Sequence, residues 1–188
     1  MLKIFGFDKK DIEEELTRFE STYKLIISDS YKKFLLRYNG GYTPKTTFKI
    51  EKISSDIRAF FGFSYAPDDY NFEYIEKMTF FEDILENGYI PIATDSFGNF
   101  IVLGIVEEKT DICFFDSELQ SFSHLTDDLE SFFEKVKSKK FVVRSVEERI
   151  QGMKDSGSDI EVDDELINLW NEEINKYFGK TQENVSLK

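Results

Sequence analysis

The chain is short of the side chains on which covalent and metal chemistry most often depends. Its 188 residues include one cysteine, Cys113, and one histidine, His124. A lone cysteine excludes a disulfide within the chain and fits a reducing compartment. Together with a lone histidine it is too little for a typical structural zinc site. Because nucleophilic catalysis needs a base beside the nucleophile, we expect Cys113 to be a core residue and His124 a surface or capping residue.

Sequence patterns for phosphate loops, membrane spans and secretion are also missing. Neither GxGxxG nor GxxxxGK[ST] occurs in the chain. No stretch approaches the roughly 20 apolar residues of a membrane span, and no long apolar run follows Lys3 as a signal peptide would require. We therefore expect a cytoplasmic protein with no cofactor, no metal and no membrane contact.

The chain has far fewer positively charged side chains than negatively charged ones. The chain has 24 lysines and arginines against 37 acids, a formal net charge of −13. A nucleic-acid binder needs a basic stripe to neutralise phosphate, so this class is disfavoured. The charge suits a basic protein partner, which it would attract over long range. Solubility alone is the other explanation, since net charge does not determine fold.

Aromatic residues are abundant, with 20 Phe and 9 Tyr. Such rings anchor a compact core and are enriched at the energetic centres of interfaces. The length suits one domain with an extension rather than two full domains.

Hydrophobic periodicity predicts a mixed α and β chain. The expected helices cover residues 8–23, 28–38, 71–87, 126–136, 146–153 and 163–179, with Ser28, Asn71 and Thr126 as N-caps. The expected strands cover residues 46–53, 60–63, 89–94, 99–106, 110–115, 119–122 and 141–144. Short turns at 95–98 and 107–109 are typical of an antiparallel meander. The predicted fold class is α+β, a mostly antiparallel twisted sheet with helices packed on one side and at its ends.

The composition changes near residue 140. We expect a domain over 1–140 and an acidic C-terminal extension over 141–188 with one or two helices. Residues 155–188 carry nine acids and three bases, and 155–159 have the composition of a flexible linker. The last helix, with Trp170 at its centre, either packs on the domain or serves as a partner- or dimer-binding arm.

Adjacent carboxylates are the remaining candidates for chemistry. They occur at Asp68-Asp69, at Asp127-Asp128 and at Asp163-Asp164-Glu165. Paired carboxylates can hydrolyse glycosides, but these lie in loops or at helix starts, where acids are favoured by the helix dipole. The acids of 155–163 lack the order of an EF-hand loop, and Asp95 is expected to bond a turn rather than to catalyse. We assign no catalytic, cofactor-binding, metal-binding or partner-binding residue.

Two blocks of sequence resemble the SUKH superfamily of Smi/Knr cell-wall-regulator-type domains. Residues 30–41, SYKKFLLRYNGG, are similar to the family pattern D-Y-x-x-F-L-x-x-x-N-G-G, although Ser28-Asp29 replaces its usual proline at the start of the helix. Residues 89–100, YIPIATDSFGNF, are similar to I-P-I-A-x-D-x-x-G-N. Residues 113–116 resemble the strand that follows. The resemblance covers roughly residues 8–137.

The resemblance implies a protein-binding module rather than an enzyme. Bacterial members are typically immunity proteins that neutralise a cognate toxin, often a nuclease or a deaminase, and eukaryotic members regulate cell-wall synthesis and signalling. For a short acidic chain we favour the immunity role, with a basic toxin domain as partner. The alternatives are a regulatory or scaffolding protein and, least favoured, a carboxylate-dependent hydrolase. The resemblance also implies that interface residues vary with the partner, so the shared motifs are scaffold.

Overall fold

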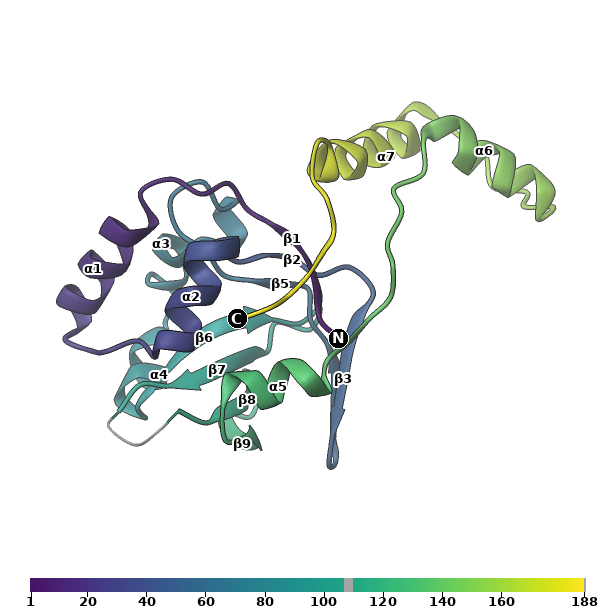
Figure 1. The fold of residues 1–188 in the computed structure, drawn as a ribbon. Helices are drawn as coiled ribbons and strands as arrows, with labels where there is room; N and C mark the ends of the chain where they lie inside the picture. The colour runs from purple at the N-terminus through teal and green to yellow at the C-terminus, as the bar shows by residue number, and fades with distance from the viewer. Residues whose placement is uncertain (107–109, 188) are drawn as a thin grey trace. The chain divides into compact units, whose positions relative to one another are not determined.

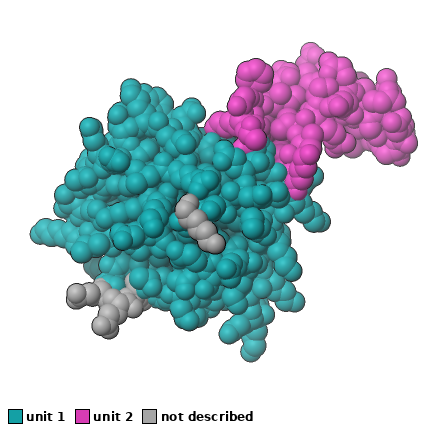
Figure 2. Space-filling model, viewed as in Figure 1, with its two compact units in different colours: residues 1–139, 182–188 teal, residues 140–181 magenta. Residues whose placement is uncertain are grey.

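The protein divides into two compact units (Figure 2). The computed structural model describes residues 1–106 and 110–187, so the predicted turn at 107–109 lies outside the described residues. One unit contains Met1–Lys139 and Gln182–Lys188, and the other contains Lys140–Thr181. Residues 182–188 therefore belong to the first unit. The sequence predicts instead that all of 141–188 form the extension.

The first unit is built on an antiparallel sheet, which confirms the predicted α+β class (Figure 1). In spatial order its strands are β11 (Glu183–Asn184), β1 (Lys3–Gly6), β2 (Gly41–Tyr42), β5 (Ala59–Phe60), β6 (Tyr89–Thr94), β7 (Phe100–Gly104), β8 (Ile112–Asp116) and β9 (Ser121–Thr126). The predicted meander is confirmed as β6, β7 and β8, which pair in sequence order. Strand β9 extends it at the sheet edge.

A second small sheet corrects the strand predicted over 46–53. It contains β10 (Lys137–Ser138), β3 (Thr46–Ile50) and β4 (Ile53–Asp56). The chain reverses between Ile50 and Ile53, which face each other across the hairpin, and Glu51 takes a left-handed φ of 51° there. The alternation of apolar and polar residues continues through this turn. Periodicity alone therefore predicts one strand where the structure has β3 and β4. The strand predicted over 141–144 is also wrong, because pairing stops at Ser138.

Helices accompany the sheet in the first unit and make up most of the second. The first unit has α1 (Ile12–Tyr23), α2 (Asp29–Tyr38), the 3-10 turn η1 (Asp68–Tyr70), α3 (Phe72–Ile75), α4 (Phe81–Glu86) and α5 (Leu129–Lys135). The second has α6 (Val146–Asp155) and α7 (Asp164–Tyr177). No described helix combines the length and the apolar character needed to cross a membrane.

Side-chain caps explain where several of these helices begin. Asn71 accepts a hydrogen bond from the Glu73 amide at 3.0 Å, as its predicted capping role requires. The predicted N-cap at Thr126 is wrong. Asp128 caps α5 instead, because its Oδ1 accepts a hydrogen bond from the Ser131 amide at 2.6 Å. Ser28 stands before α2, but its side chain makes no capping hydrogen bond.

Phenylalanine rings join the helices to the sheet. On α2, Phe34 lies 5.2 Å from the ring of Phe60 on β5 and 5.4 Å from Phe133 on α5. On α1, Phe19 lies 5.1 Å from Phe72 of α3. These side chains are buried, and each buried large side chain contributes roughly 1.5–3 kcal/mol relative to an exposed one. The aromatic richness of the sequence is therefore accounted for mainly by the core.

The Asn39-Gly40-Gly41 motif locks the end of α2 to its neighbours. Asn39 is fully buried and has a left-handed φ of 51°. Its Nδ2 donates to the carbonyls of Asp8 and Phe63 at 2.8 and 2.9 Å, and its Oδ1 accepts from the Phe63 amide at 2.8 Å. A Cβ on Gly62 would overlap the carbonyl of Asn39. The motif is therefore a structural lock.

We predict that Asn39→Ala lowers the free energy of unfolding of the first unit by about 3 kcal/mol, because it leaves buried backbone groups without partners. Asn87→Ala, at an exposed position, is the matched control and should change it by no more than about 0.5 kcal/mol. Urea unfolding followed by circular dichroism measures both. Similar losses in the two variants would contradict the locking role.

Candidate functional site

The structure brings the only cysteine and the only histidine onto neighbouring strands. Cys113 on β8 faces His124 on β9 in the register of the sheet. Cys113 is 3% exposed, and its Sγ donates to the Tyr89 hydroxyl and to Asp111 Oδ2, each at 3.3 Å. Burial raises the pKa of Tyr89, which stays protonated and donates to Asp111. The thiol thus lies in the core rather than facing a substrate.

The histidine and the adjacent carboxylates make local structural contacts. His124 is paired with Asp127 at 3.1 Å, and both side chains are largely exposed. Asp128 caps α5, and Asp163 caps α7 by accepting the Leu166 amide at 2.8 Å. Within the residues that the structure describes, no group of three or more His, Cys, Asp and Glu could hold a metal ion. Asp128 and Asp163 thus act at helix starts, where the helix dipole favours carboxylates, and Asp68 and Asp69 lie in the 3-10 turn η1.

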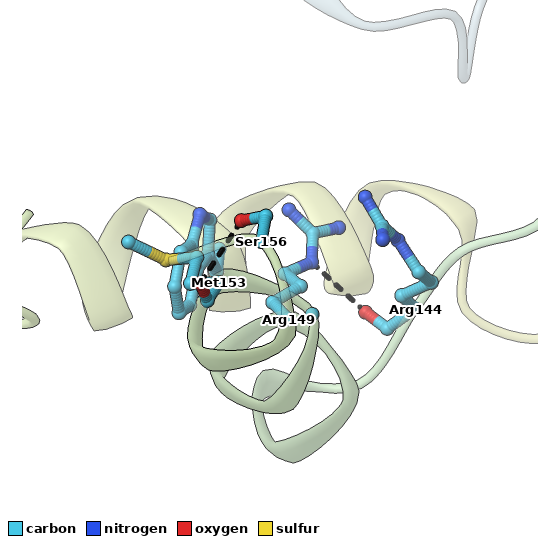
Figure 3. Close-up of a pocket in the computed structure, with 6 residues that line it drawn as sticks. Arg144, Arg149, Met153 and Ser156 are labelled. Atoms are coloured by element: carbon cyan, nitrogen blue, oxygen red, sulfur yellow. Dashed lines mark hydrogen bonds between the residues drawn. The ribbon is translucent and has the colours of Figure 1, made fainter. Parts of the chain in front are cut away.

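One pocket lies between the two helices of the second unit (Figure 3). It has a volume of about 350 Å³ and is lined by Arg144, Arg149, Gly152, Met153, Ser156 and Trp170. Arg149 donates to Glu173 at 2.6 Å and to the Arg144 carbonyl at 3.0 Å, and its guanidinium lies 5.7 Å from the centre of the Trp170 ring. Glu173 neutralises Arg149, so this arginine links the helices and is poorly suited to hold an anion.

A different feature stands out in the first unit, at the turn between β6 and β7. Asp95 is 3% exposed and accepts four hydrogen bonds. The donors are the Ser55 hydroxyl at 2.7 Å, the Phe97 amide at 2.8 Å, and the Asn99 amide and side chain, each at 2.9 Å. A buried carboxylate with this many donors is well satisfied. Asp95 therefore fixes the turn, as its position in the sequence predicts.

The turn between β8 and β9 is tied to the first one. Asn99 Oδ1 accepts from the Ser117 amide at 3.1 Å. Asp116 Oδ1 accepts from the amides of Glu118 and Leu119 at 3.0 and 2.8 Å. Two turns at the same end of the meander thus form one hydrogen-bonded block.

This block displays apolar side chains among carboxylates. Phe97 is 80% exposed and Leu119 is 73% exposed. We call the surface the acidic tip; it consists of Asp56, Ser96, Phe97, Asp116, Glu118 and Leu119. Asp56 accepts hydrogen bonds from the amide and the hydroxyl of Ser96. Among residues 1–106 and 110–187, no ion pair involves the carboxylates of Asp56, Asp116 or Glu118.

The acidic tip has the physical properties of a binding surface. Its turns are ordered before any partner arrives, which reduces the entropy lost on association. An exposed aromatic ring on a rigid support can act as an anchor, and carboxylates without an ion pair in the described part of the chain favour a basic partner. The family pattern leaves the position of Phe97 open, so nothing in the sequence marked it as a site residue.

We predict that Asp95→Ala speeds hydrogen exchange of the Phe97 and Asn99 amides by about tenfold or more, because each loses a partner worth roughly 1.5–3 kcal/mol. Asp127→Ala, at a side chain that is 95% exposed, is the control and should leave these amides unchanged. Exchange measured by nuclear magnetic resonance tests this. Unaltered rates in Asp95→Ala would show that the carboxylate does not hold the turn.

A search against protein-family models returned a match. The family model that matches the chain is described as the SMI1 / KNR4 family (SUKH-1), and it covers residues 13–135. That span runs from α1 through α5 and includes both motifs. The search of curated proteins and that of solved structures each returned no match. Because the match covers well over half of the sequence, the chain belongs to the SMI1 / KNR4 (SUKH-1) family.

Proposed function

We propose that this SUKH-type module is an immunity protein that binds a bacterial toxin of the nuclease or deaminase type and blocks its substrate groove. The observation that carries the proposal is the acidic tip, where exposed Phe97 and Leu119 stand beside carboxylates without ion-pair partners in the described chain. The toxin would be met in the cytoplasm, where the single cysteine stays reduced.

The chemistry of such a toxin complements the tip. An enzyme that acts on nucleic acid lines its groove with lysine and arginine to neutralise phosphate, and aromatic surfaces there stack on bases. Asp116 and Glu118 would take the place of phosphate charge, and Phe97 the place of a base. The net charge of −13 would speed encounter with a basic domain.

The proposed mechanism is occupancy of the groove, without turnover by this protein. The side chains from which a reaction could be built have other roles, since Cys113 is buried and Asp128 and Asp163 cap helices. A carboxylate-dependent hydrolase has no paired site to support it among these residues.

The alternative is a regulatory or scaffolding role in cell-wall synthesis or signalling, which the resemblance to the Smi/Knr domains implies. The acidic tip would then bind a basic segment of an enzyme that is not toxic. The identity of the partner separates the two functions, because a cognate toxin is lethal when it is expressed without its immunity protein.

The test is co-expression with the toxin encoded by the adjacent gene, followed by measurement of Kd. We expect the intact protein to abolish toxicity and to co-purify with the toxin. Phe97→Ala should weaken binding by about 30-fold, the effect of losing an anchor worth roughly 2 kcal/mol.

Ile26→Ala provides the matched control, because Ile26 is 78% exposed and lies between α1 and α2 rather than at the tip. Its Kd should equal that of the unchanged protein. Unchanged toxicity together with no co-purification would contradict the immunity proposal. Equal losses in Phe97→Ala and Ile26→Ala would remove the tip from it.

A further inference from the structure

The helical unit, residues 140–181, has almost no core of its own. Every residue in this range is described, and Tyr177 is the one buried side chain. No residue of α6 is buried. Helices of ten and fourteen residues are marginal in water unless packing supports them. The unit therefore lacks the burial that normally stabilises a pair of helices.

An ion pair and a cation–π contact join its two helices. Arg149 pairs with Glu173 at 2.6 Å and lies over the Trp170 ring at 5.7 Å. At the base of the unit, Phe141 packs on Tyr177 with ring centres 5.0 Å apart. These contacts hold the helices side by side, although no residue of α6 is fully buried.

Large apolar side chains remain exposed in the unit. They are Val142 at 63%, Ile160 at 66%, Leu169 at 60% and Phe178 at 81%. With one buried residue in the unit, these side chains offer apolar surface that a partner could cover. The question is which occupant fits.

The negative charge of the unit indicates which occupant fits. Residues 155–173 carry eight acids and no lysine or arginine: Asp155, Asp159, Glu161, Asp163, Asp164, Glu165, Glu172 and Glu173. A second copy of this chain, at −13, would meet this stretch with repulsion. A segment that is both basic and amphipathic would satisfy the carboxylates and cover the apolar side chains.

The unit is also tethered at both ends to the first unit. The chain leaves through β10, which pairs with β3, and returns through β11, which pairs with β1. Gln182 Nε2 donates to the Lys139 carbonyl at 3.3 Å, and the Lys3 amide donates to Ser138 Oγ at 2.9 Å. The unit is thus an insertion between two adjoining anchors. A second contact held by such a tether adds to the affinity of the first.

We propose that the helical unit is a second partner-binding element, which completes its burial against a basic amphipathic helix of the protein partner. Only the identity of that partner rests on the proposed immunity function. The acidic tip would supply a rigid anchor, and the helical unit would supply a surface that becomes ordered on binding.

A synthetic peptide of leucine and lysine tests this with the full-length protein. The peptide has the 14-residue length of α7 and places its leucines on one helical face; a scrambled peptide of the same composition is its control. Trp170 is the only tryptophan, so tryptophan fluorescence, excited beyond the tyrosine absorption band, reports on this unit alone. We expect saturable binding with slower amide exchange in α6 and α7, and no such effect of the scrambled peptide.

The variant Ile160→Ser with Leu169→Ser should weaken peptide binding at least about tenfold, as loss of apolar contact area requires. Ile26→Ser, at an exposed position outside both the helical unit and the acidic tip, should bind the peptide unchanged. Equal binding by the double variant, equal binding by the scrambled peptide, or no fluorescence change would overturn the proposal. So would slow exchange of α6 and α7 in the free monomer, or a dimer in sedimentation that protects them.

The two proposals can fail separately. Peptide binding without rescue from the adjacent toxin would leave the helical unit as a binding element and remove the immunity function. If the protein rescues cells from the adjacent toxin but does not bind the peptide, the immunity function stands and the helical unit is not a binding element.

Discussion

The buried carboxylate of Asp95 is the constraint on which the proposed binding surface depends. A charge removed from water is tolerated only where donors replace the lost solvation, and four donors do so here. The same hydrogen bonds hold the backbone on either side of Phe97. Asn99 passes the constraint to the neighbouring turn through Ser117. Asp95 thus holds the backbone beside Phe97 directly and contacts the turn that carries Leu119 through Asn99.

Asn39 plays a corresponding role at the other motif. It holds the end of α2 against the chain at Asp8 and at Phe63, and glycine at position 62 makes this close approach possible. Both motifs of the family therefore act on backbone placement. Under the proposed function, side chains such as Phe97, which the motif positions but does not specify, would determine the choice of partner.

Much of the fold could be predicted from the sequence because its signals are local. The helix ending at Asn39 and the meander around Pro91 follow from periodicity and turn residues. The hairpin at Glu51 could not, because its strands form one continuous pattern. The pairing of β1 with β11 joins residues at opposite ends of the chain, and two short strands carry no periodic signal. The exposure of Phe97 depends on the fold around it, and in a chain with 20 Phe most are core.

The two units bury their aromatic rings to different extents. In the first unit rings such as Phe34 are buried, whereas in the second Trp170 lies among charged groups.

The most direct test of the account is photo-crosslinking in the presence of the adjacent toxin. Benzoylphenylalanine replaces Phe97 in one variant and Ile26 in the control variant. The account predicts a crosslink to the toxin from position 97 and none from position 26. A crosslink from position 26 alone would contradict it.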